Sequence, residues 1–346
     1  MAEREILPSP SSPVREGQCA MGTYISGFRE VNLLDVQRPL GFPVPRWARW
    51  LRLKEWQAMQ LDTPVWFVCA AVYNTKSIGT AIVMAFNKEQ QVLYRYEHKV
   101  PCWKLHVPKG LYGTRCHYSS RNLDIAFNNR LDDGQIDVAF SAAGFAGNPD
   151  IAFSLGGAHV IEPIVILQPF AKNRPLYSHK ALMPAQGRVI VDGVETVIEA
   201  TDSALIVDDH KGYYPYTMQY DWVTGIGRTP DGGLIGFNLT DNQVQHPERF
   251  NENCLWVDGQ MQPLSPVKIE RPGGVAQSWF VRDAEGRVDL QFTPLADVPI
   301  KLNLGIARMD YHGPTGRLDG FILNRAGEKV VFDGCYGMGE QKLMRL

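Results

Sequence analysis

The feature that most constrains the fold is a long succession of short segments in which apolar and polar residues alternate. The sequences LDIAF at 123–127 and IDVAF at 136–140 show the pattern. Because successive side chains of a β-strand point to opposite faces, this alternation predicts strands that bury one face. In the first half of the chain, strands are expected at residues 65–73, 79–86, 91–98, 115–118, 122–128, 135–141 and 163–170.

The second half of the chain has the same texture. Asp-Gly turns at residues 192–193, 231–232, 258–259 and 333–334 favour antiparallel hairpins. Strands roughly 8–12 residues apart, with few helices between them, predict an all-β fold made of a pair of sandwiches or barrels. The expected strands are 189–191, 196–200, 203–207, 219–224, 234–239, 255–257, 267–270, 276–281, 287–292, 300–307, 317–323 and 329–332.

The 346 residues are long enough for two domains preceded by an extension. Residues 1–18 are charged, rich in Pro and Ser and without an apolar core, so they predict a loose arm rather than a secretory signal. The Pro-rich region 168–186 lies between two similar sets of strands. We therefore expect an N-terminal arm and loop at 1–45, a first barrel-like domain with a leading helix at 46–180, and a second barrel-like domain at 181–346.

One amphipathic helix is expected at residues 46–61, RWARWLRLKEWQAMQL. Its apolar residues recur mostly at steps of three and four, and prolines precede and follow the segment. One interpretation is a helix packed across a sheet or a barrel mouth. The other is a lid, or an element in transient contact with a membrane surface, because three tryptophans among basic residues suit an interface.

The overall charge argues against partners that need a strong electrostatic field. The chain has 35 basic and 37 acidic residues, a formal net charge of −2, so no nucleic-acid partner is expected. The longest apolar run, near residues 65–72, is well short of the about 20 residues of a membrane-spanning helix. These features predict a cytoplasmic protein and leave its oligomeric state open.

Titratable and aromatic residues are concentrated at 208–222, DDHKGYYPYTMQYDW, between apolar strands. Such a concentration points to a functional site. On an alternating strand, Asp209 lies on one face while Asp208 and His210 lie on the other, so one of Asp209 and His210 is expected to point inward. The next two residues, Lys211-Gly212, are expected to turn at a barrel rim or domain seam.

A carboxylate beside an imidazole can tune it for proton transfer near neutral pH, so Asp209 and His210 are candidate catalytic residues. The structural alternative is that His210 caps a turn and Asp209 binds backbone amides. Tyr213 is a further catalytic candidate. Trp222 is expected near the cavity, where its indole either packs in the core or stabilises a developing cation.

Other polar residues are candidates for substrate binding. Glu252 is a plausible second carboxylate, although an Asx-type loop at 251–253 is the structural alternative. No ligand spacing supports a metal site, and no cofactor is expected; the motifs of common hydrolases, kinases and dehydrogenases are also absent from the sequence. His117 begins a strand and could face a cleft, with a structural histidine as the alternative. The substrate-binding candidates are Tyr214, Tyr220, Asp221, Glu252, Asn253 and His117.

Four stretches together resemble the domain of unknown function 2804 family: LRLKEWQAMQL, DDHKGYYPYTMQYDWVTG, GFNLTDNQVQHPERFNENCLWVDG and DGCYGMGEQKLMRL. That family is distantly similar to carotenoid 1,2-hydratase and AttH-like proteins. The resemblance implies two antiparallel lipocalin-like β-barrels with a hydrophobic cavity. It also implies that Asp209, His210, Trp222 and a tyrosine, Tyr213 or Tyr220, protonate an isolated double bond.

Three functions are compatible with these observations. The leading hypothesis is a cofactor-independent acid–base enzyme, of hydratase, cyclase or isomerase type, acting on a hydrophobic small molecule such as an isoprenoid, lipid or polyketide. The second is a lipocalin-like carrier or sensor, whose polar residues only orient a lipophilic ligand. A weaker alternative is a glycan-binding or glycoside-processing protein, in which aromatic residues stack on sugars.

Overall fold

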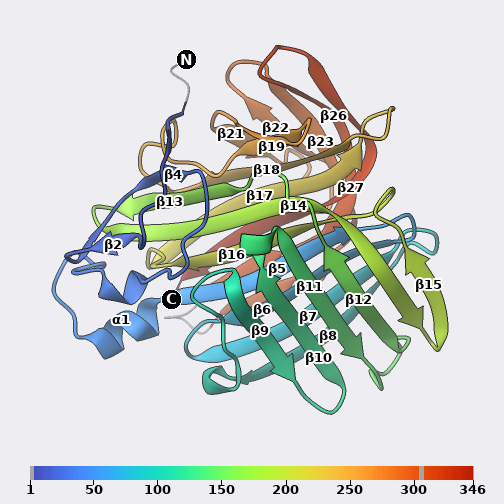
Figure 1. The fold of residues 1–346 in the computed structure, drawn as a ribbon, viewed down its shortest axis with the longest axis horizontal. Coiled ribbons are helices and arrows are strands. Elements are labelled where there is room, and N and C mark those ends of the chain that lie inside the picture. Colours follow the sequence, from blue (N-terminus) through green and yellow to red (C-terminus); the bar gives the residue numbers. More distant parts are fainter. Residues whose placement is uncertain (1–3, 304–307, 346) are drawn as a thin grey trace. The chain divides into compact units, whose positions relative to one another are not determined.

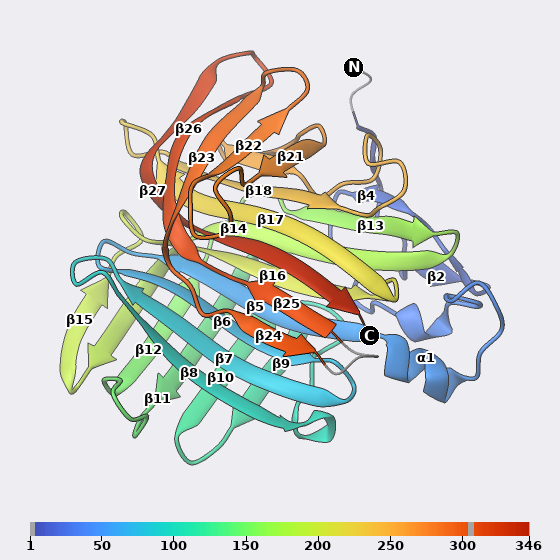
Figure 2. The ribbon, with the colours of Figure 1, turned by 180° about the vertical axis from the view of Figure 1, so that it is seen from behind.

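The structure is a computed structural model that describes residues 4–303 and 308–345, and it confirms the all-β prediction. The chain forms two compact units, one of residues Glu5–Tyr213 and one that combines Arg4 with residues 214–345. Each is built on one large, mainly antiparallel sheet that curls into a half-barrel (Figures 1 and 2). In the described part of the chain, no helix is long and apolar enough to cross a membrane.

In the unit Glu5–Tyr213 the main sheet has the strand order β8-β7-β6-β5-β16-β14-β12-β11-β10-β9. Its elements are β1 (Ile6–Leu7), β2 (Val14–Arg15), β3 (Gln18–Cys19), β4 (Gly22–Tyr24), η1 (Leu33–Asp35), α1 (Arg46–Arg52), β5 (Lys54–Asp62), β6 (Trp66–Asn74), β7 (Ile78–Asn87), β8 (Val92–Pro101), η2 (Cys102–Lys104), β9 (Tyr112–Ser119), β10 (Leu123–Arg130), η3 (Leu131–Asp133), β11 (Gln135–Ala142), β12 (Ile151–Gly157), β13 (Ile164–Ala171), β14 (Arg174–Val191), β15 (Val194–Ile198) and β16 (Ala204–Gly212).

The inner face of this sheet carries the core of the unit. Alternate residues of each strand meet there, which is the arrangement that the period-two pattern predicts. On β5 and β16, for example, Met59, Leu61, Leu205 and Val207 are all fully buried in one cluster. The same alternation continues toward the ends of these strands, where the inward positions become polar.

The Pro-rich region 168–186, expected as the boundary between domains, is occupied by strands. β14 runs without interruption from Arg174 to Val191, pairing first with β13 and β16 and then with β12 and β15. Its residues Tyr177, His179, Ala181 and Met183 alternate with residues of the other face, so the segment has strand periodicity despite its prolines. Position 180, the expected end of the first domain, therefore lies within β14. The chain instead passes from one compact unit to the other between Tyr213 and Tyr214.

The helix expected at residues 46–61 is only half helical. α1 ends at Arg52, and β5 follows directly from Lys54 to Asp62. β5 is hydrogen-bonded to β6 on one side and to β16 on the other, at the centre of the sheet. These ladders and the burial of Met59 and Leu61 outweigh the helical spacing of the sequence, as tertiary context often does.

The N-terminal segment, expected as a loose arm, is ordered through most of its length. β4 joins the sheet by pairing with β13, and β1 pairs with β4. Phe28 and Val36 are fully buried in a cluster with Tyr177 and Tyr213. The Pro and Ser content thus marks turns between short strands rather than disorder.

The other unit has the strand order β20-β19-β18-β17-β27-β26-β23-β22-β21. Its interior includes the fully buried Phe237, Trp279 and Phe292. The last part of the strand expected at 300–307, residues 304–307, lies outside the described residues. The strands are β17 (Thr217–Arg228), β18 (Leu234–Asn242), β19 (Cys254–Val257), β20 (Gln260–Pro263), β21 (Val267–Glu270), β22 (Trp279–Asp283), β23 (Val288–Ala296), β24 (Ile300–Asn303), β25 (Arg308–His312), β26 (Thr315–Leu323) and β27 (Lys329–Arg345).

The tightest expected hairpins are confirmed by the backbone. Asp192 and Gly193 join β14 to β15 with φ of 47° and 82°, and Asp258 and Gly259 join β19 to β20 with φ of 54° and 73°. Positive φ at both central residues is the signature of a type I′ turn, which matches the twist of the paired strands. Asp-Gly is among the sequences that reach this conformation most easily.

Arg4 is held within the same unit as Asn251. Its guanidinium donates to the carbonyl and the side-chain oxygens of Asn251, at 2.6 Å each, and to the carbonyl of Leu264 at 2.6 Å. We expect Arg4→Ala to destabilise this unit by about 2–4 kcal/mol, because it leaves buried carbonyl groups without a donor. Thermal unfolding would measure the loss, with Arg15→Ala as a control at an exposed arginine; equal melting temperatures of the two variants would contradict the anchoring role.

Candidate functional site

The strand β16 presents two sets of polar side chains on its two faces. Asp209 and Lys211 share the inner face with Val207, whereas Asp208 and His210 share the outer face. All four are buried, with at most 5% of their surface exposed. The expected alternation is therefore confirmed, and Asp209 is the member of the pair that points inward. The turn expected at Lys211-Gly212 is absent, because β16 and its pairing with β5 and β14 continue through Gly212.

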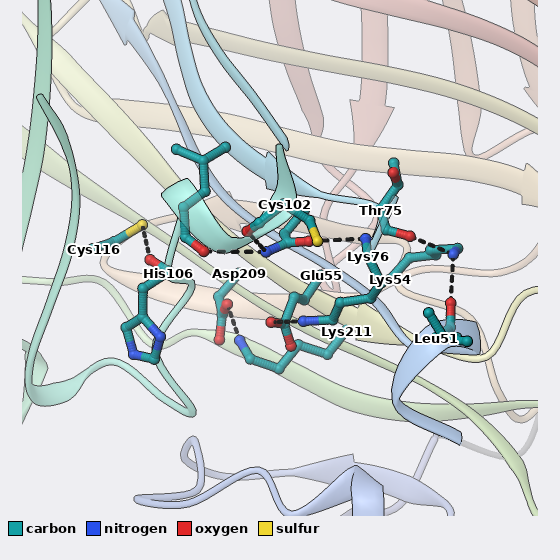
Figure 3. A network of polar contacts seen from close by, with 12 residues as sticks. Leu51, Lys54, Glu55, Thr75, Lys76, Cys102, His106, Cys116, Asp209 and Lys211 are labelled. Atoms are coloured by element: carbon teal, nitrogen blue, oxygen red, sulfur yellow. Dashed lines mark hydrogen bonds and ion pairs between the residues drawn. The ribbon is translucent and has the colours of Figure 1, made fainter. Parts of the chain in front are cut away.

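On the inner face, Lys211 Nζ donates a hydrogen bond to Asp209 Oδ1. Beside this pair, Lys76 Nζ donates to Glu55 Oε1, and Glu55 is the residue paired with Lys211 on β5. Figure 3 shows these four side chains in one network. Asp209 Oδ2 has no hydrogen-bond partner among residues 4–303 and 308–345, so one oxygen of a fully buried carboxyl group is left available.

Burial changes the acidity of this carboxyl group. It raises the pKa of Asp209 to about 6, because desolvation disfavours the carboxylate more than the nearby Lys211 favours it. Burial of His179, together with the positive charge of Lys211, lowers the pKa of His179 to about 3. Near neutral pH, His179 is thus an uncharged imidazole, while Asp209 exchanges protons within a unit or so of neutrality. This is the pKa range that general acid–base catalysis needs.

His179 is a residue that the sequence analysis missed. It lies opposite Asp209 on β14, and directly paired residues of antiparallel strands have their side chains close together. Its Nδ1 has no hydrogen-bond partner in the described part of the chain. Tyr177, two residues earlier, lies opposite Lys211, whose Nζ is 5.9 Å from the centre of the phenol ring. The alternation of residues 177–183 could have revealed both, but the flanking prolines concealed it.

A pair of amides completes this polar end of the inner face. Gln57 lies opposite Asp209 on β5, and its Nε2 donates to Asn129 Oδ1 at 2.6 Å. Asn129 Nδ2 in turn donates to Gln57 Oε1 and to Thr114 Oγ1, both at 3.1 Å. The fully buried Cys116 lies on the neighbouring strand β9. The interlocked amides fix the surroundings of Asp209, which favours a preorganised site.

The outer face has a separate pair of contacts. Lys180 Nζ donates to Asp208 Oδ2 at 2.9 Å, and the His210 ring lies 4.4 Å from the Trp56 ring, edge to face. Because His210 and Asp209 lie on opposite faces, they do not form a catalytic dyad. Neither part of the structural alternative holds, since His210 lies within a strand and Asp209 pairs with Lys211.

Two other candidates in this unit are held in different surroundings. The Tyr213 hydroxyl donates to the carbonyl of Leu33 at 3.1 Å, and burial raises the pKa of Tyr213. His117 follows the inward-facing Cys116 on β9 and therefore points outward. Its side chain is 39% exposed, and its Nε2 lies 3.5 Å from Asp124 Oδ2. The structure places His117 away from the inner-face groups.

The remaining candidates belong to the other unit, where a buried polar cluster contains three of them. Trp222 Nε1 donates to Asn238 Oδ1 at 2.6 Å, and Asn238 Nδ2 donates to the carbonyl of Glu252 at 2.8 Å. The Tyr220 hydroxyl donates to Glu252 Oε1 at 2.8 Å. Tyr214 is also buried. The structure thus brings Tyr220, Trp222 and Glu252 together on one side of the unit's sheet.

Asp221 and Asn253 have other surroundings within that unit. Asp221 points to the opposite face of β17 from Trp222 and forms an ion pair with Arg271, 2.6 Å apart. Burial raises the pKa of Asp221, against the effect of Arg271. Asn253 N–H donates to Asn251 Oδ1, and Asn253 Oδ1 accepts from the backbone of Thr240 at 2.7 Å. The first bond is that of the expected Asx-type loop, and the second ties the loop to β18.

The loop after β4 covers the end of the inner face at His179. Gly27 N–H donates to the Tyr112 hydroxyl at 2.9 Å, and a Cβ at position 27 would lie 2.5 Å from His179 Cε1. We expect Gly27→Ala to destabilise the protein by about 1–3 kcal/mol through this overlap. Urea unfolding would measure it, with Gly156→Ala as control, since a Cβ there meets nothing closer than 3.8 Å. Equal stability of both variants would show that the loop does not pack on His179.

Comparison with known proteins identifies both the family and the fold. The model of the family described as domain of unknown function DUF2804 matches residues 14–346. No curated protein matches the sequence closely enough to count as a relative. The family match covers all four of the sequence stretches on which the resemblance rested, so the expected relation is confirmed.

Solved structures share the fold at low sequence identity. The crystal structure of CghA has a TM-score of 0.53 and 11% identity, and the match covers 99% of this chain and 97% of that one. CghA with Sch210972 gives 0.52 and 12%, covering 85% and 88%. Kievitone hydratase from Nectria haematococca gives 0.50 and 12%, covering 84% and 88%. At these identities the likeness establishes the paired, lipocalin-like β architecture.

Proposed function

The chain belongs to the DUF2804 family, and we propose that it is a cofactor-independent acid–base enzyme of hydratase, cyclase or isomerase type that acts on a hydrophobic small molecule. The observation that carries this proposal is the buried Asp209 carboxyl group on the inner face of the unit Glu5–Tyr213. Its Oδ1 is held by Lys211, and its Oδ2 has no protein partner in the described part of the chain. The fold shared with a hydratase supports the same class of reaction.

The step common to these reactions is protonation of a carbon–carbon double bond. Protonated Asp209 gives its proton to one alkene carbon, and the positive charge develops on the other carbon. In a hydration, a water oxygen then bonds to the cationic carbon, and the water's proton returns to the Asp209 carboxylate. In an isomerisation, the carboxylate removes a proton from a neighbouring carbon instead. Either route restores the acid without an external oxidant or reductant.

The surroundings of Asp209 fit this sequence of steps. The apolar residues deeper on the inner face, such as Met59 and Val207, suit the body of a hydrophobic substrate. Lys211 stabilises the Asp209 carboxylate that remains once the alkene has taken the proton. His179 is neutral and therefore adds no positive charge beside the developing cation. A low-dielectric environment strengthens each of these interactions.

The acid role implies a characteristic pH dependence. Asp209 acts as a donor only when protonated, so kcat is expected to be highest below the pKa of about 6 and to fall about tenfold per pH unit above it. A series of kcat measurements between pH 5 and pH 8, with folding checked by circular dichroism at each pH, would test this. A rate that rises through the same interval would point to Asp209 acting as a base.

The proposal is tested by searching for the substrate with a matched inactive variant. Purified wild type and Asp209→Asn are each incubated with a lipid and metabolite extract, and mass spectrometry follows both the extract and the bound fraction. Compounds converted by wild type alone, at unchanged mass or with one water gained or lost, would support the enzyme. A lipophilic ligand retained unchanged by both proteins would instead support the carrier and reject Asp209 as an acid.

A further inference from the structure

We propose that the unit Glu5–Tyr213 binds peripherally to membranes rich in anionic lipids. The contact is made by the Trp patch, defined here as Trp47, Trp50 and Trp103 together with Arg46 and Lys104. This inference concerns an interaction surface and is independent of the proposed catalytic role of Asp209. It rests on the exposure of the three indoles, on their position at one end of the unit, and on the charge around them.

The exposure of these tryptophans sets them apart. Trp47 is 67% exposed, Trp103 is 77% exposed and Trp50 is 38% exposed, whereas Trp66 in the same unit is 6% exposed. Exposing the apolar surface of a large indole to water is unfavourable, and neighbouring exposed indoles mark an interaction surface. Tryptophan favours the boundary between apolar and aqueous phases.

A chain of contacts places the patch at one end of the unit. Lys76 Nζ lies 5.4 Å from the centre of the Trp50 ring, and the backbone N–H of Lys76 donates to Asn74 Oδ1 at 2.8 Å. Asn74 Nδ2 then donates to the carbonyl of Cys102 at 3.0 Å, directly before Trp103. Figure 3 shows Lys76 beside Cys102, with the end of α1 at Leu51 close by. The helix α1 and the turn η2 therefore neighbour each other.

The charge of these segments identifies the partner. Residues 36–54 contain five basic residues and no acidic residue: Arg38, Arg46, Arg49, Arg52 and Lys54. Residues 98–111 also contain no acidic residue, and their basic residues are Lys99, Lys104 and Lys109. The whole chain has a net charge of −2, so the positive charge is local. Three of these cations have acidic partners: Arg46 pairs with Asp35 at 2.8 Å, Lys99 with Glu97 at 3.7 Å and Lys109 with Glu30 at 2.5 Å. Lys54 is buried, and the other cations still outnumber these acidic groups. Exposed indoles among an excess of cations match the headgroup region of an anionic bilayer.

Vesicle co-sedimentation of the full chain tests the proposal directly. At low salt, the wild type is expected to sediment with vesicles containing phosphatidylserine and to stay in solution with pure phosphatidylcholine vesicles. High salt should release it, because it screens the charges. We expect Trp47→Ala/Trp103→Ala to weaken binding at least about tenfold. Arg46→Gln/Lys104→Gln should do the same, since each charge contributes about fivefold.

The control is Val194→Ala/Val197→Ala, which removes apolar surface that is equally exposed, on β15. It is expected to bind vesicles as the wild type does. Circular dichroism would confirm that each variant is folded, and the two patch variants act through different chemistry, so failure of one to fold leaves the other. No sedimentation of the wild type with anionic vesicles would overturn the proposal. So would binding of both patch variants as strong as that of the wild type.

Discussion

Asp209→Asn is expected to lower kcat by about 10²–10⁴-fold on the substrate found by the extract screen, while the protein stays folded. The amide is nearly the same size as the carboxyl group but has no proton of suitable acidity to give to a double bond. Asp209 is fully buried and one of its oxygens is held by Lys211, so the substitution removes the acidic proton without opening the site. Steady-state kinetics at pH 6 would measure the effect.

The neighbouring residue provides a matched control. Asp208 is also buried and also pairs with a lysine, Lys180, but it lies on the outer face of β16. Asp208→Asn therefore makes the same chemical change one residue away and is expected to keep kcat within a few-fold of wild type. His210→Ala, on the same outer face, should behave likewise. Equal losses in Asp209→Asn and Asp208→Asn would indicate damage to the sheet rather than loss of an acid.

Lys211→Met is expected to destabilise the protein by about 3 kcal/mol at pH 7. It removes the cation that pairs with the fully buried Asp209, and breaking a buried ion pair leaves an uncompensated charge. Without that cation the pKa of Asp209 should rise further. The loss of stability should shrink toward pH 5, because Asp209 is then protonated in the folded protein. Urea unfolding at pH 5 and pH 7 would measure both values.

Lys180→Met separates this effect from a general cost of removing a buried lysine. It breaks the ion pair with Asp208 on the outer face and is expected to destabilise the protein without moving the pKa of Asp209. A pKa of Asp209 that is unchanged by Lys211→Met would contradict the electrostatic coupling proposed for the inner face.

Period-two alternation made most of the fold predictable. It located the strands around residues 65–141, and it correctly separated Asp209 from His210 on β16. This rule is local and geometric, so it needs no knowledge of what packs against the strand. The Asp-Gly hairpins at 192–193 and 258–259 were predictable because the backbone conformation of the turn selects its residues. The turn expected at 333–334 is wrong, because β27 continues through these residues.

What the sequence could not give depends on long-range pairing. Residues 54–61 have helical spacing, but they form β5 because β6 and β16 supply hydrogen bonds on both sides. Prolines made 168–186 resemble a linker, which hid β14 and with it His179. Asp209, His179 and Gln57 lie side by side on three strands that are far apart in the chain, so no local pattern could have revealed this arrangement.

The most direct test of the account is the pKa of the Asp209 carboxyl group, measured by ¹³C NMR titration of labelled wild type and assigned by its absence in Asp209→Asn. We expect a pKa near 6, raised by the burial of Asp209 and limited by Lys211. This measurement needs no substrate. A value near 4, that of an aspartate in water, would contradict the claim that this carboxyl group is poised to donate a proton.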